Sequence, residues 1–190
     1  MLKISLLSSF LAFSLLFQAC SSEKSNHEKA TKSKQNNSDN NTITLHAINN
    51  QEYLLTKTDN GFKLDNSQAK ILILDVFATW CPPCQAEAPH LASLQKKYKN
   101  SIKIIGISIE ENIPNDKLQA FRNAHKADYT LVNSPANRDV VSAMAQELKL
   151  GQNFGIPLLA IYKNGKLVKY YQGAIEEEFI ESDIKKALGI

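Results

Sequence analysis

Hydrophobic residues in the middle of this chain alternate between strand-like and helix-like spacing. Residues 71–77 form an apolar, β-rich run that only Asp75 interrupts, and this run predicts a buried strand. Residues 85–98 carry apolar side chains at helical spacing, and residues 102–109 form a second apolar run of strand length. Strand, helix and strand in this order predict a β-α-β unit, with a parallel pair of strands and helices on the faces of the sheet.

Weaker patterns flank this unit on both sides. Two pairs of short runs, each joined by a turn sequence, predict β-hairpins at residues 42–48 with 52–57 and at residues 158–163 with 166–172. The other elements that we expect are a short strand over residues 129–132 and helices from Pro114, over 139–150 and over 175–188. Together they predict an α/β fold in one domain, residues 42–190.

The first 41 residues have a different composition from the rest. Residues 1–19 contain Lys3 followed by an apolar segment, which is shorter than the roughly 20 apolar residues of a membrane span. We therefore expect residues 1–19 to be a bacterial signal peptide. The alternatives are an uncleaved membrane anchor and ordinary signal cleavage without lipidation. Residues 21–41 are almost entirely polar and cannot bury enough apolar surface to fold, so they are expected to be a disordered linker.

The end of the signal segment, residues 17–20 (FQAC), resembles a lipobox. This resemblance implies that Cys20 becomes the lipidated N-terminal residue and anchors the chain to a membrane; the choice between inner and outer membrane stays open. The formal net charge of +3 is too small to favour nucleic acid as a partner.

Two cysteines three positions apart, Cys81 and Cys84, lie where the strand over residues 71–77 passes into a helix. A thiolate is the nucleophile of disulfide exchange, and a helix N-terminus favours negative charge. Cys81, at the exposed start of the helix, is expected to attack a substrate disulfide, and Cys84, inside the first turn, to resolve the mixed disulfide. A redox-active disulfide of this kind needs no metal or organic cofactor.

Pro82 and Pro83 fit the first helical turn but remove two backbone N–H groups beside Cys81. The nearest remaining donors are the N–H groups of Cys84 and Gln85. Because a stabilised thiolate makes a dithiol oxidising, the missing donors favour a reductant.

The order of elements resembles a thioredoxin fold, in which a central mixed sheet is flanked by helices. The closer resemblance, over residues 42–190, is to the TlpA/ResA-like branch of periplasmic thiol:disulfide oxidoreductases. Four motifs carry it, at residues 75–84 (DVFATWCPPC), 84–89 (CQAEAP), 154–157 (FGIP) and 162–166 (YKNGK). Residues 111–150 match the strand-and-helix insertion of that branch.

The resemblance implies a substrate-docking surface around the cysteines. Pro157 matches the cis-proline of the family, which faces the cysteine pair and offers neighbouring backbone to an extended substrate. Ile156 is bulky and apolar as in reducing thioredoxins. Trp80 is expected to cover the cysteine pair and to contribute to docking together with Pro82 and Pro83; the alternative for Trp80 is a core aromatic.

Two carboxylates are candidates for proton transfer. Asp75 stands where thioredoxins keep a buried aspartate, and an unpaired carboxylate in an apolar strand is costly unless it is protonated or hydrogen-bonded. Glu87 matches an acidic residue that the TlpA/ResA-like branch carries one turn after its second cysteine, although a solvated helix glutamate is the alternative. The sequence leaves open which of the two handles the proton.

These features predict a membrane-tethered reductase in the bacterial cell envelope. The resemblance implies disulfide-containing client proteins such as apocytochrome c, and an oxidising envelope requires a membrane thiol donor to recharge the dithiol. The alternatives are a disulfide oxidase or isomerase of the same fold and a copper-binding assembly factor. No histidine lies at a metal-binding spacing from the cysteines, and we expect no metal and a monomer.

Overall fold

The computed structural model describes residues 41–151 and 153–190, so the expected signal peptide, Cys20 and the linker up to residue 40 lie outside the described residues. The strands are β1 (Thr42–His46), β2 (Glu52–Thr58), β3 (Gly61–Leu64), β4 (Ile71–Phe77), β5 (Ile102–Ser108), β6 (Thr130–Val132), β7 (Leu158–Lys163) and β8 (Lys166–Gln172). The helices are α1 (Pro82–Lys97), α2 (Asn115–His125), α3 (Asn137–Glu147) and α4 (Glu177–Leu188). Within these residues no helix is both long and apolar enough to cross a membrane.

The larger sheet has the strand order β6-β5-β4-β7-β8. Strands β4, β5 and β6 run parallel, and β7 and β8 pair antiparallel with their neighbours. The predicted β-α-β unit and the predicted β7–β8 hairpin are therefore both confirmed. Asn164 and Gly165 form the hairpin turn with φ values of 52° and 78°, the left-handed conformation that an Asn-Gly turn supplies.

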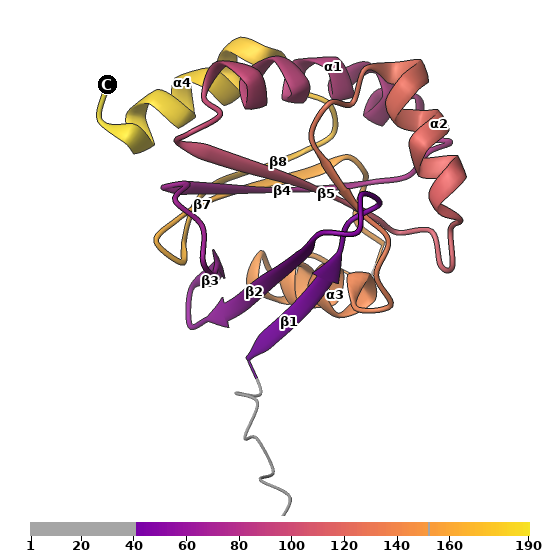
Figure 1. The fold of residues 1–190 in the computed structure, drawn as a ribbon. Coiled ribbons are helices and arrows are strands. Elements are labelled where there is room, and N and C mark those ends of the chain that lie inside the picture. Colours follow the sequence, from indigo (N-terminus) through magenta and orange to yellow (C-terminus); the bar gives the residue numbers. More distant parts are fainter. Residues whose placement is uncertain (1–40, 152) are drawn as a thin grey trace, which may run out of the picture. The chain divides into compact units, whose positions relative to one another are not determined.

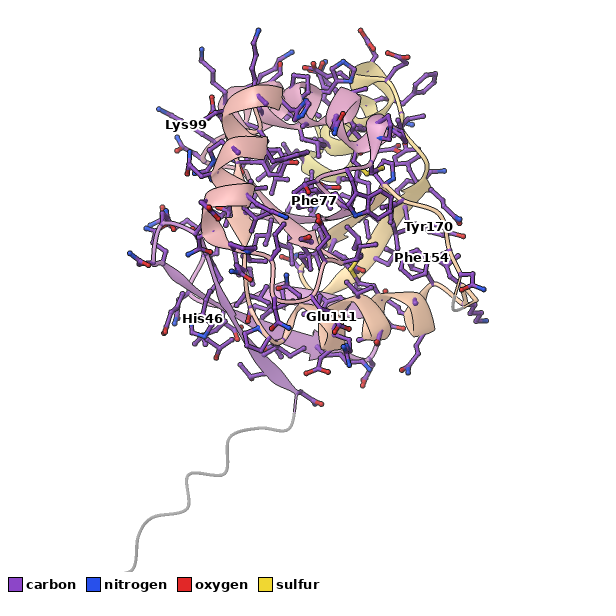
Figure 2. All side chains as sticks on the ribbon, turned by 90° about the vertical axis from the view of Figure 1, so that its right-hand side faces the viewer. His46, Phe77, Lys99, Glu111, Phe154 and Tyr170 are labelled. Atoms are coloured by element: carbon purple, nitrogen blue, oxygen red, sulfur yellow. A yellow bond between two sulfur atoms is a disulfide. The ribbon has the colours of Figure 1, made fainter. Side chains whose placement is uncertain are left out.

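The two faces of this sheet contact different partners (Figure 1). Helices α1, α2 and α4 cover one face, and α3 lies on the other with strands β1–β3. Because side chains alternate along a strand, Ile71, Ile73 and Phe77 of β4 pack toward α1, while Leu72 and Leu74 join the opposite core. Phe77 lies inside the molecule below the helices (Figure 2).

This alternation decides where the one charged residue of β4 lies. Asp75 shares the parity of Ile73 and Phe77, so its side chain is on the face that α1 covers. The helix that carries the cysteines therefore lies directly over the only carboxylate of the strand.

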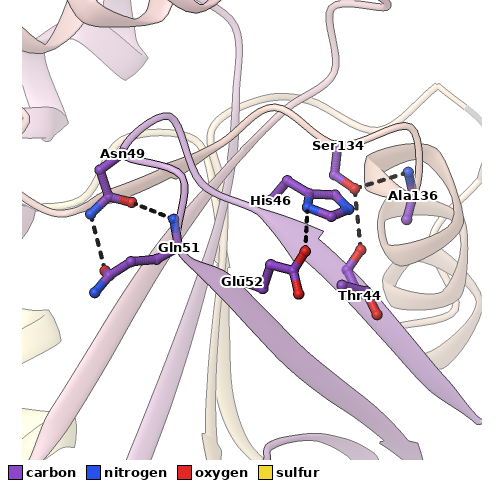
Figure 3. Close-up of polar contacts among 7 residues, drawn as sticks. All are labelled: Thr44, His46, Asn49, Gln51, Glu52, Ser134 and Ala136. Carbon is purple, nitrogen blue, oxygen red and sulfur yellow. Dashed lines mark hydrogen bonds and ion pairs between the residues drawn. The ribbon is translucent and has the colours of Figure 1, made fainter.

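The N-terminal part forms a three-stranded antiparallel sheet, where the sequence pattern predicted only a hairpin of two strands. The extra strand, β3, follows Asn60, and Phe62 packs edge-on against Tyr162 of the larger sheet. Ser134 ties this small sheet to the insertion, since its hydroxyl donates to the Thr44 carbonyl at 3.2 Å and accepts from the Ala136 N–H at 3.3 Å (Figure 3).

Two helices begin or end a few residues away from the expected positions. Helix α4 starts at Glu177 and not at Ile175, and α3 covers Asn137–Glu147 and not residues 139–150. The first difference matters, because Ile175 is left in a loop with its N–H free to bond outside the helix. The expected insertion is present, and its strand β6 extends the larger sheet beside β5.

Candidate active site

The Cys81–Cys84 pair forms a disulfide at the start of α1, with 5.3 Å between the two Cα atoms. Cys81 is the N-cap residue, with extended backbone angles, and its sulfur accepts a hydrogen bond from the Cys84 N–H at 3.3 Å. Strand β4 ends at Phe77, so only a short loop separates the sheet from the disulfide.

The number of N–H donors at the Cys81 sulfur is smaller than we expected. The Gln85 N–H bonds the Cys81 carbonyl at 3.0 Å, and Pro82 and Pro83, both exposed in the first turn, have none to offer. Within the described residues the Cys84 N–H is the one donor to this sulfur. The two prolines thus leave the Cys81 sulfur with fewer backbone N–H groups than a helix start without prolines would offer.

Exposure does not separate the two cysteines, contrary to our expectation of an exposed Cys81. Both residues are only 3% exposed and belong to the core between α1 and the sheet. What separates them is position: Cys81 lies before the helix, and its sulfur is 3.8 Å from the Ile156 carbonyl oxygen.

The Ile156–Pro157 peptide bond is cis, as the resemblance implies. It precedes β7, so the Ile156 carbonyl oxygen near the Cys81 sulfur belongs to the residue just before the cis-proline. Pro157 is buried and Ile156 is half-buried, so the apolar Ile156 side chain lies partly open beside the disulfide.

Trp80 is 64% exposed and is therefore not a core aromatic. The loop that carries it is held at Thr79, whose N–H and hydroxyl donate to the two Glu110 carboxylate oxygens at 2.6 and 3.1 Å. Gln85 donates its side-chain amide to the Thr79 carbonyl at 2.7 Å. A large aromatic side chain on a fixed loop next to the disulfide is suited to contact a docked protein.

Asp75 is 2% exposed and lies below α1. One carboxyl oxygen, Oδ2, accepts a hydrogen bond from the Tyr129 hydroxyl at 2.9 Å, and Oδ1 has no partner among the described residues. Burial raises the pKa of Asp75 to about 7, although the Tyr129 hydrogen bond opposes this rise. A carboxyl group with this pKa exchanges protons readily near neutral pH.

Glu87 is equally buried, at 2% exposure, which excludes a solvated helix glutamate. Its Oε1 accepts from the Ile175 N–H at 3.1 Å, and Oε2 has no partner among the described residues. Burial raises the pKa of Glu87 to about 8, the negative charge of Asp75 adds to the rise, and the Ile175 bond opposes it. The structure thus places both candidate carboxylates in one buried pair.

Three residues of this arrangement were not identified from the sequence: Tyr129, Glu110 and Ile175. A signal for Tyr129 was present, because Gly106 interrupts the β-branched run of β5, and a glycine inside a strand often marks the close approach of another group. Glu110 and Ile175 lie in loops, where no periodic pattern indicates a contact partner.

Metal binding has no support within the described residues, where no group of three or more histidine, cysteine or acidic side chains is placed to hold a metal ion. His46 pairs with Glu52 at 3.4 Å on exposed neighbouring strands (Figure 3). The site thus consists of the Cys81–Cys84 disulfide and two buried carboxyl groups, Asp75 and Glu87.

Comparison with known proteins agrees with this geometry. The Redoxin family model matches residues 24–188. The thiol-disulfide oxidoreductase ResA of Halalkalibacterium halodurans is 27% identical over 126 residues, which are 64% of this chain and 64% of that protein. The thioredoxin-like protein slr1139 of Synechocystis is 26% identical over 136 residues, 71% of this chain and 95% of that protein.

Among solved structures, a thioredoxin-family thiol:disulfide interchange protein from Chlorobium tepidum has a TM-score of 0.61 at 19% identity, covering 78% of this chain and 94% of that one. This likeness confirms the thioredoxin-like fold. The chain spans just under two thirds of the ResA relative, 64% of its length. The family match covers most of the chain, and the cysteines, the cis-proline and the insertion are all in place. The chain therefore belongs to the Redoxin family.

Proposed function

We propose that this protein reduces disulfides in client proteins through the Cys81–Cys84 dithiol. The observation that carries this proposal is the single N–H donor at the Cys81 sulfur. A weakly stabilised thiolate favours the disulfide form of the enzyme, so the reduced enzyme gives up its electrons readily. The apolar Ile156 before the cis-proline supports the same direction.

In the reaction, the Cys81 thiolate attacks one sulfur of the client disulfide, and the other client sulfur leaves as a thiolate. Cys84 then loses its proton to the buried carboxyl pair, and its thiolate attacks the Cys81 sulfur of the mixed disulfide. This attack forms the Cys81–Cys84 disulfide and releases the second client thiolate. The client gains two electrons, and its two thiolates take up protons from water. The enzyme loses the same two electrons, and the proton of Cys84 stays on the carboxyl pair until it passes to solvent.

The burial of Asp75 and Glu87 supports this sequence of steps. A second carboxylate nearby and an apolar environment both disfavour charge, so one proton is readily held on the pair at neutral pH. When Cys84 must be deprotonated, Asp75, with a pKa of about 7, is the better acceptor. We therefore assign the proton transfer to Asp75 and a supporting electrostatic role to Glu87.

The test is the reduction potential of the full-length protein, equilibrated with glutathione or dithiothreitol buffers and followed by Trp80 fluorescence. We expect a value near the roughly −270 mV of thioredoxin. A value near the roughly −120 mV of a strong oxidant would overturn the direction and make the chain a donor of disulfides.

For the location, we propose an envelope protein held to a membrane by lipidated Cys20, acting on exported clients such as apocytochrome c and recharged by a membrane thiol donor. The lipobox-like residues 17–20 and the polar segment after them support this. Cys20→Ser is expected to abolish incorporation of labelled fatty acid and to move the protein from the membrane fraction to the soluble fraction. Fatty-acid labelling that persists in the variant contradicts the anchor.

A further inference from the structure

Tyr129 reaches the proton acceptor by crossing a strand of the central sheet. It immediately precedes β6, whereas Asp75 lies in β4, and β5 runs between the two. The β5 residue paired with Asp75 is Gly106. A Cβ atom at this position would lie 3.0 Å from Cε2 of the Tyr129 ring and 2.9 Å from Leu131. Because Gly106 has no side chain, the Tyr129 ring can cross β5 at this position.

Two hydrogen bonds hold the backbone of Tyr129. The Arg122 guanidinium donates from Nη2 to the Tyr129 carbonyl oxygen at 2.7 Å, and the Tyr129 N–H bonds the Ala127 carbonyl at 2.8 Å. Tyr129 itself is only 5% exposed. Its hydroxyl therefore has a fixed direction, and burial raises its pKa so that it keeps its proton and acts as a donor.

We propose that Tyr129 is a positioning residue for the redox reaction, which fixes the Asp75 carboxyl by donating to Oδ2 and leaves Oδ1 to receive the Cys84 proton. This inference rests on the proposed function, since it names the residue that prepares the acceptor. Tyr129 belongs to the insertion, residues 111–150. The insertion would then contribute a residue that positions Asp75 for the reaction.

The effect of this hydrogen bond on Asp75 has a definite sign. A donor to a carboxylate stabilises its charged form, and the Tyr129 bond opposes the rise that burial causes in the pKa of Asp75. Without it, a larger fraction of Asp75 is protonated at neutral pH and unable to accept a proton. The step that deprotonates Cys84 then requires a higher pH.

Other groups facing Asp75 are few. Glu87 comes from α1, and the Asp75 charge raises its pKa; Cys84 is a buried residue of the same helix. Arg122 of α2 bonds the Tyr129 carbonyl oxygen and makes no hydrogen bond to Asp75 among the described residues. The residues paired with Asp75 in β5 and β7, Gly106 and Leu159, carry no charge. Tyr129 is thus the one side chain that hydrogen-bonds the Asp75 carboxyl among the described residues.

The test compares Tyr129→Phe with Tyr162→Phe in the full-length protein. Tyr129→Phe keeps the ring above Gly106 and removes only the hydroxyl. Tyr162 is a matched control, because it is fully buried and its hydroxyl bonds a carboxylate, Glu147 at 3.2 Å, but it belongs to the core on the other face of the sheet. Both variants lose one buried hydroxyl.

The first readout is an infrared titration of the oxidised protein, in which the Asp75 carboxyl band is identified by its loss in Asp75→Asn. We expect the titration midpoint to rise by about one pH unit or more in Tyr129→Phe and to stay at the wild-type value in Tyr162→Phe. The second readout is the pH profile of the exchange reaction with glutathione disulfide. The release of the second glutathione should shift in the same direction in Tyr129→Phe.

Each outcome bears on a separate claim. If the two midpoints of Tyr129→Phe and wild type coincide, or if Tyr162→Phe shifts equally, the inference is wrong. An infrared shift without a shift in the exchange profile overturns the role of Tyr129 in the reaction. If the wild-type protein itself exchanges no disulfide, the proposed function fails, while the infrared titration still decides whether Tyr129 controls Asp75.

Discussion

Serine in place of Cys84 is expected to stop the reaction at the mixed disulfide, with one client molecule bound covalently to Cys81. Cys81 lies before the helix and faces the Ile156 carbonyl, where a client disulfide can meet it. Resolution needs a second thiolate within reach, and Cys84 is the residue to which Cys81 is linked in the oxidised form. Without Cys84, turnover should be lost completely while the first attack still occurs.

The measurement is the amount of covalent adduct on a non-reducing gel, with the adduct site identified by mass spectrometry. Cys81→Ser is the matched control, because it has the same single-atom change one helical turn away and should form no adduct. An adduct that forms through Cys84 in Cys81→Ser would show that the roles of the two cysteines are reversed.

The oxidised protein is expected to lose stability as the pH rises from about 4 to about 8. Asp75 and Glu87 have pKa values raised by burial to about 7 and about 8. In this range the unfolded chain has already released the two protons that the folded protein still holds, so raising the pH favours unfolding. The stabilisation is complete below about pH 4 and is lost as the pH passes through the two folded-state pKa values.

Asp75→Asn should remove about half of this dependence on pH, because Glu87 contributes a similar share. A pKa difference of about three units corresponds to about 4 kcal/mol, so at pH 9 the variant should be more stable than wild type by a few kcal/mol. At pH 4 the two should be nearly equal. The measurement is urea unfolding of the oxidised protein at several pH values, with the exposed Asp59→Asn as the control.

The same substitution is expected to slow disulfide exchange at neutral pH, because an asparagine cannot accept the Cys84 proton. Gain of stability together with loss of activity is typical of a buried charge that a site retains for its chemistry. If Asp75→Asn instead lowers stability at every pH, the carboxyl has a structural role and the assignment of the proton acceptor must move to Glu87.

Much of the fold follows from local patterns. The seven residues of β4 are all buried, as their apolar run predicts, and the Asn-Gly turn joins β7 to β8 where its backbone preference indicates. The proline-rich start of α1 and the spacing of Cys81 and Cys84 likewise depend only on neighbouring residues. Such features can be inferred from sequence because their physical causes act over one turn or one strand.

The sequence also identified Asp75 and Glu87 as candidates, but not their surroundings. Whether Glu87 is solvated or buried depends on α4 and on the loop at Ile175, which is 88 positions away along the chain. The exposure of Cys81 was predicted wrongly for the same reason, since the Ile156 carbonyl, 75 positions away along the chain, lies 3.8 Å from its sulfur.

Two cysteines at a helix start, a proline that matches the family's cis-proline and an acidic residue in an apolar run can be recognised from the chain alone, and they predict disulfide exchange. The contacts of that acidic residue depend on the tertiary structure. Tyr129 meets Asp75, 54 positions away, because the register of β4 with β5 places Gly106 beside Asp75 and leaves room for the ring. Strand register and side-chain packing arise from the whole core at once, and no local pattern in the chain encodes them.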